Sequence, residues 1–66
     1  MGHHPAVAAL LRFFEHAHLP IHLQAVVVPF HRLAHDLADG LPPGAETTTA
    51  LRKLLESKDC AVRSML

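Results

Sequence analysis

Tryptophan and tyrosine are absent from this 66-residue sequence, and phenylalanine occurs only three times. A hydrophobic core must therefore come mainly from leucine, valine and alanine, within a composition that is 50% hydrophobic and typical of packed helices. The single cysteine, Cys60, excludes an intrachain disulfide framework and fits a reducing compartment. We expect its thiol to be a small buried hydrophobic group.

An excess of charge of either sign is also missing, because six Lys and Arg residues balance six Asp and Glu residues. The broad positive field of a DNA-binding protein or of a protein on an anionic membrane is therefore absent, although a small local anion site is compatible with this balance. No apolar run approaches the roughly 20 residues that a helix needs to cross a bilayer. We expect a soluble intracellular protein without a DNA or membrane partner.

Two helical patterns of similar length flank the segment Leu41-Pro42-Pro43-Gly44-Ala45, which predicts a helical hairpin with helices over residues 20–41 and 45–66. Pro29 lies inside the first apolar stripe, which continues in phase on both sides of it, so we expect a kink there rather than a stop. The expected stripes are Leu23, Val26 or Val27, Phe30, Leu33, Leu37 and Leu41 on the first helix, and Ala50, Leu51, Leu54, Leu55, Ala61, Val62, Met65 and Leu66 on the second.

A shorter helix is expected over residues 5–17, since Pro5 favours a helix start and Pro20 begins the next helix. Its apolar face carries Val7, Leu10, Leu11, Phe14 and His18. The predicted fold is all-α: a short N-terminal helix plus a two-helix antiparallel hairpin in one domain, residues 1–66. Because so small a hairpin leaves apolar surface uncovered, we expect it to assemble as a homo-oligomeric helical bundle.

Histidine is over-represented, with seven residues at positions 3, 4, 16, 18, 22, 31 and 35. His31 and His35 lie one helical turn apart and have the spacing to share a metal ion, with Asp36 or Asp39 nearby. The HExxH pattern is absent, however, because position 32 is Arg, and no second ligand pair has metal-site spacing. We predict no metal site and favour pH-sensitive or solvated histidines, with a metal-responsive His-rich bundle as an alternative.

Motifs of catalysis are missing as well. The sequence has no Gly-rich phosphate loop and no GxSxG elbow, and Cys60 lies in an apolar helical run rather than in an electropositive pocket. We therefore expect neither enzyme activity nor a cofactor.

The stretch from Phe14 to Met65 carries a resemblance to known proteins. It reads Phe-Glu-His-Ala-His-Leu-Pro, then Leu-Gln before a long helix, then Glu-Thr-Thr-Thr-Ala-Leu-Arg-Lys-Leu-Leu-Glu-Ser-Lys-Asp-Cys-Ala-Val-Arg-Ser after the Pro/Gly turn. This pattern resembles small proteins of actinobacterial phages. More distantly, it is similar to the hairpin domain of phage anti-defence sponges, which sequester the cyclic-nucleotide signals of the bacterial CBASS and Thoeris systems.

The resemblance implies a homo-hexamer of hairpins in the host cytoplasm that binds cyclic di- or trinucleotides between protomers and does no chemistry on them. It implies stacking on a base by His16 or Phe14, and it places cations of the site on both hairpin helices. The ligand-binding positions carried over in this way are Phe14, His16, His31, Arg32, Arg52, Lys53 and Arg63.

These residues also have structural interpretations. A phenylalanine such as Phe14 is more often a core or interface residue than a platform for a base, and Arg32 and Arg63 have the spacing to pair with Asp36 and Asp59 on a solvated helix surface. A second hypothesis for the whole chain is therefore a structural or interaction module, a helical hairpin oligomer whose partner is another protein.

Overall fold

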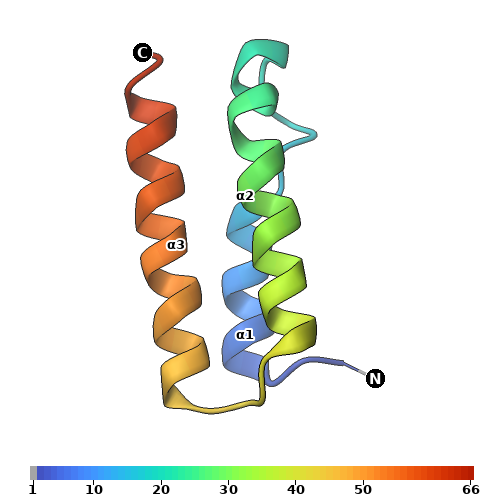
Figure 1. The fold of residues 1–66 in the computed structure, drawn as a ribbon. Coiled ribbons are helices and arrows are strands. Elements are labelled where there is room, and N and C mark those ends of the chain that lie inside the picture. The colour runs from blue at the N-terminus through green and yellow to red at the C-terminus, as the bar shows by residue number, and fades with distance from the viewer. Residues whose placement is uncertain (1) are drawn as a thin grey trace.

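The computed structural model describes residues 2–66, and every regular element in that range is helical. The elements are α1 (Pro5–Leu11), the short 3-10 helix η1 (Arg12–Phe14), α2 (Ile21–Gly40) and α3 (Ala45–Arg63). In Figure 1, α2 runs antiparallel to α1, and α3 returns beside α2 so that the C-terminus lies near the start of α2. The all-helical class, with three helices in the predicted order, is confirmed.

The first helix is shorter than the predicted range of residues 5–17. It begins after His4, whose Nδ1 accepts a hydrogen bond from the Ala6 amide at 3.1 Å. It then tightens into η1, and at Glu15 the backbone becomes extended, with φ −62° and ψ 144°. The connection over residues 15–20 then contains a turn, in which the Leu19 amide donates a hydrogen bond to the His16 carbonyl at 3.0 Å, and it leads to the start of α2.

Pro29 lies within α2, which is continuous from Ile21 to Gly40. The expectation that Pro29 does not stop this helix is confirmed. A proline at this position removes the amide that would bond to the carbonyl of Ala25. Because Ala25 and Pro29 are both exposed, water can hydrogen-bond to that carbonyl, and the helix continues.

The first turn of α3 is bonded to the Pro/Gly turn. Thr47 is buried, and its hydroxyl donates a hydrogen bond to the Pro42 carbonyl at 2.6 Å. At its other end α3 stops at Arg63 rather than at residue 66, and Leu66 is 84% exposed. The predicted burial of Met65 and Leu66 is therefore wrong, because both follow the end of the helix, and Ala50 of the same predicted stripe is exposed as well.

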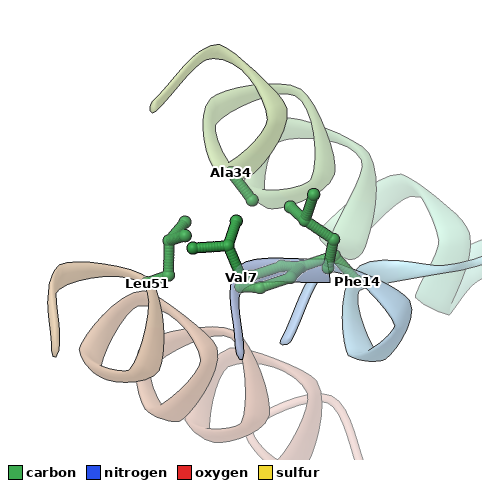
Figure 2. Packing of buried hydrophobic residues seen from close by; sticks show 5 residues of the cluster. Val7, Phe14, Ala34 and Leu51 are labelled. Atoms are coloured by element: carbon green, nitrogen blue, oxygen red, sulfur yellow. The ribbon is translucent and has the colours of Figure 1, made fainter. Parts of the chain in front are cut away.

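The core contains buried side chains from α1, η1, α2 and α3. Figure 2 shows how they converge, with the Phe14 ring lying between the helices. Phe14, Ala34 and Leu51 are fully buried. The cluster consists of Val7, Leu11, Phe14, Ala34 and Leu51, with Leu10, Phe30, Leu37, Ala38, Leu54 and Leu55 packed against it. The N-terminal segment thus closes part of the core that the hairpin alone would leave open.

The inner face of α2 differs by one position from the predicted stripe. Ala34 is fully buried, whereas Leu33 and Leu41 are 46% and 40% exposed. The buried positions Leu23, Val27 and Ala34 are spaced by four and by seven residues, so they keep the expected heptad rhythm. The prediction chose Leu33 because it is the larger apolar side chain, but the next residue, Ala34, faces the core.

Truncation of Leu51 should destabilise the fold strongly, because its side chain is fully buried in the core cluster. For Leu51→Ala we expect a loss of about 2–5 kcal/mol in the free energy of unfolding, most of what so small a domain has. Urea unfolding followed by circular dichroism measures this loss. Leu66→Ala removes the same atoms from an exposed position and should change the free energy by less than about 0.5 kcal/mol. Equal losses in both variants would contradict the assigned core.

Candidate functional site

A surface groove of about 410 Å³ lies between the N-terminal segment and the C-terminal half of α3. We call it the Arg63 groove. It combines an aromatic ring, three permanent cations and two carboxylates. Its lining residues are Arg12, Phe13, Glu15, His18, Leu19, Lys58, Asp59, Val62 and Arg63.

The aromatic side chain of this groove is available to a ligand, since Phe13 is 58% exposed. It lies next in sequence to Arg12, and both belong to η1, which directs the neighbouring Phe14 into the core. The 3-10 turn therefore places one phenylalanine inside the protein and the other at the groove.

The charges of the groove are only partly compensated. Lys58 Nζ lies 2.8 Å from Asp59 Oδ1, and Arg63 Nη2 donates a hydrogen bond to Cys60 Sγ at 3.2 Å. The expected pair between Asp59 and Arg63 is not formed. Among residues 2–66, neither Arg12 nor Arg63 has a carboxylate partner within salt-bridge distance, so both guanidinium groups can bind an anion.

Arg52 lies in a separate cleft of about 510 Å³ at the start of α3. This cleft is lined by His4, Pro43, Gly44, Ala45, Thr48, Thr49 and Arg52. Arg52 and Arg63 are 11 positions apart on α3, which corresponds to about 16 Å along the helix axis. Lys53 is exposed and lines neither cleft. The cations implied by the resemblance therefore do not meet within one protomer.

The remaining residues implied by the resemblance have different surroundings. Phe14 is fully buried, so the expectation that it stacks on a ligand base is wrong and the core interpretation holds. Arg32 is exposed on α2, and across the described residues it forms no ion pair with Asp36. His16 and His31 are half-buried and belong to another group of side chains, which we call the histidine cluster.

The histidine cluster consists of His16 on the 15–20 connection and of His31 and His35 on α2. The ring centroids of His16 and His31 are 5.0 Å apart, with the planes nearly perpendicular at 88°. Those of His31 and His35 are 4.4 Å apart and tilted by 43°. His16 Nδ1 and His35 Nε2 are buried and have no hydrogen-bond partner among residues 2–66.

The environment of the cluster disfavours the charged form of its central member. Burial lowers the pKa of His31 below its ordinary value of 6.5, and the neighbouring His35 and His16 lower it further. Glu15 acts in the opposite direction because a carboxylate favours an imidazolium. Across the described part of the chain, no three His, Cys, Asp or Glu side chains are grouped so that they can hold a metal ion.

Asp39 pairs with the N-terminal segment rather than with His35. His3 Nε2 lies 2.7 Å from Asp39 Oδ1 at the protein surface. Sequence reasoning missed both this contact and the partnership of His16 with His31. The two pairs are 36 and 15 positions apart in the chain, and no local periodicity connects residues at such separations.

A comparison of the chain with protein-family models, with curated proteins and with solved structures finds no match. Within the part of the chain that the structure describes, no helix combines the length and the hydropathy that a membrane crossing requires.

Cys60 should react readily with thiol reagents in the native protein, because it is exposed, contrary to the expected buried position. We expect Ellman's reagent to modify one thiol per chain in native protein as completely as in urea-unfolded protein. Cys60→Ser, which has no thiol, provides the blank. Protection of the thiol until unfolding would show that Cys60 is covered in solution.

Proposed function

We propose that this protein is a small helical oligomer that captures an anionic, base-containing signal of the cyclic oligonucleotide class and holds it unchanged, as a sponge does. The observation that carries this proposal is the Arg63 groove, where exposed Phe13 lies in the same lining as Arg12, Lys58 and Arg63. The resemblance stated above supports a cyclic oligonucleotide as the class of ligand. The side chains of the groove support this groove as the binding site.

The chemistry of the groove suits such a ligand. A nucleobase stacks on an aromatic face, and phosphodiester oxygens accept hydrogen bonds from guanidinium groups in a bidentate arrangement. Phe13 takes the stacking role, and Arg12 and Arg63 bind the phosphates. The groove volume of about 410 Å³ lies in the range of small-molecule sites. Capture requires only stacking and charge pairing, so the proposal includes no reaction.

A second protomer is expected to complete this site. Exposed apolar residues follow shortly after lining residues of the groove in the sequence, namely Ile21 at the start of α2 and Met65 and Leu66 after α3. Figure 1 shows that the start of α2 and the C-terminus lie at the same end of the molecule. A neighbouring chain that covers these residues also covers the end of the groove and excludes water from the ligand.

A structural or interaction module remains the second candidate function. It is favoured by the number of large apolar side chains on a protein of this size that are 40% exposed or more. These are Phe13, Ile21, Leu33, Leu41, Met65 and Leu66. A helical hairpin oligomer that contacts another protein through these residues needs no small-molecule ligand.

A thermal-shift panel of cyclic di- and trinucleotides and cyclic ADP-ribose isomers tests the sponge proposal. We expect one of them to raise the melting temperature, because a ligand at 100 times its Kd adds about 2.7 kcal/mol to folded-state stability. Arg63→Ala should weaken that ligand's binding by tenfold or more, the scale of a lost charge-assisted hydrogen bond.

Two variants serve as controls for this panel. Arg63→Lys keeps the positive charge and should retain part of the affinity. Arg52→Ala removes a cation about 16 Å away along α3 and should leave binding unchanged. An equal loss in Arg52→Ala would move the site to the start of α3 or to an interface between protomers. The absence of any thermal shift would favour the structural module.

Light scattering of the purified protein tests self-association. We expect the mass of several chains, with six as the number that the resemblance implies. Ile21→Lys should lower the mass because a charge on an exposed apolar position is costly to bury. Ser57→Lys, at another exposed position, is the matched control. A monomer at all concentrations would contradict both the oligomer and a site shared between protomers.

A further inference from the structure

The histidine cluster has no part in the proposed ligand site, yet it joins two segments that are distant in sequence. His16 lies on the 15–20 connection. Its ring packs against the ring of His31 on α2 in a T-shaped arrangement, with the centroids 5.0 Å apart. His31 in turn stacks at a tilt against His35, one turn further along the same helix.

Few hydrogen bonds join the 15–20 connection to α2 in the described part of the chain. The Pro20 carbonyl accepts from the first amides of α2, and the Gln24 side-chain amide donates to the Leu19 carbonyl at 2.7 Å. The Leu19 backbone amide donates to the His16 carbonyl at 3.0 Å, which is a bond within the connection itself. The ring contact of His16 with His31 therefore lies nearer the start of the connection than any of these hydrogen bonds to α2.

The surroundings of the cluster disfavour a positive charge on His31. His16 Nδ1 and His35 Nε2 are shielded from water and have no hydrogen-bond partner among the described residues. The groups that influence the titration of His31 are His35 on its own helix and His16 and Glu15 on the connection. Glu15 is the one carboxylate of this set, and it is exposed, so water screens its attraction.

We propose that the histidine cluster is an acid-sensitive latch that holds the 15–20 connection against α2 while the His31 imidazole is neutral and releases it when His31 becomes protonated. A proton on His31 places a charge between two other imidazoles in a partly dehydrated position. Rotation of His16 into water relieves both the burial of that charge and the repulsion. This inference does not rest on the proposed ligand or on its site.

The direction of the pH dependence follows from the lowered pKa of His31. The closed state holds the proton less tightly than the open state, so the open state binds more protons as the pH falls. The closed form is therefore most favoured above the ordinary histidine value of 6.5, and this preference is lost as the pH falls through the lowered pKa of His31. Each pH unit through this range changes the ratio of open to closed forms by up to about tenfold.

NMR of the whole chain between pH 8 and pH 5, with EDTA present, tests the latch. The reporter is the nuclear Overhauser effect between ring protons of His16 and His31, whose centroids lie 5.0 Å apart in the closed state. We expect this effect to be lost as the pH falls below 6.5, the direction set by the lowered pKa of His31, while the amides of α3 stay protected from hydrogen exchange. Side-chain NMR of His31 should show titration over the same interval.

Two substitutions at His31 keep the test decisive. His31→Phe retains a ring without a titrating group and should keep its ring contact with His16 down to pH 5. His31→Gln, which also lacks a titrating group, is the second variant, and far-ultraviolet circular dichroism checks that each one folds. His22→Phe, at an exposed position of α2, is the matched control and should behave as the original chain does. The proposal is overturned by a pH-independent contact between His16 and His31, by an equal loss in His31→Phe, or by simultaneous loss of protection in α3.

Discussion

Burial of Phe14 is the constraint on which the rest of this structure depends. Two helices joined by a Pro/Gly turn can each bury one apolar stripe against the other, but two such stripes do not enclose a core. The fully buried Phe14 ring fills the space that α1, α2 and α3 leave between them. To place it there the chain tightens from α1 into η1, and the next residue, Glu15, is already extended. One aromatic side chain thus decides where the first helix ends and how the hairpin is closed.

Both notable surface features follow from this arrangement. Because η1 turns Phe14 inward, Arg12 and Phe13 lie on the outer side and meet the C-terminal half of α3 in the Arg63 groove. Because the chain leaves η1 in an extended form, His16 reaches α2 and meets His31.

Local sequence signals were sufficient for the helices and for the turn between α2 and α3. The Pro/Gly segment and the uninterrupted stripe around Pro29 predicted elements that the structure contains. Features that depend on packing between distant segments were not predictable in this way. The burial of Ala34 in place of Leu33, the exposure of Cys60 and the contact of His16 with His31 arise from how α1 and the 15–20 connection lie on the hairpin. Of the candidate ligand residues, Arg63 lines the groove. Helical spacing correctly placed Phe14 on the apolar face, but Phe13, the aromatic member of the groove, was missed because no local pattern shows that it lies beside the C-terminal half of α3.

The 15–20 connection also links the two proposals physically. His16 attaches it to α2 through the histidine cluster, while Glu15, His18 and Leu19 form part of the lining of the Arg63 groove. A connection released from α2 no longer holds these residues in fixed positions. Phe13 and Arg12 would keep their places, since they belong to η1, which is anchored by buried Phe14. Acid would therefore loosen the side of the groove formed by the 15–20 connection and leave the side formed by α3 and η1 in place. A bound anion would become more exposed to water while it still contacted Arg12 and Arg63.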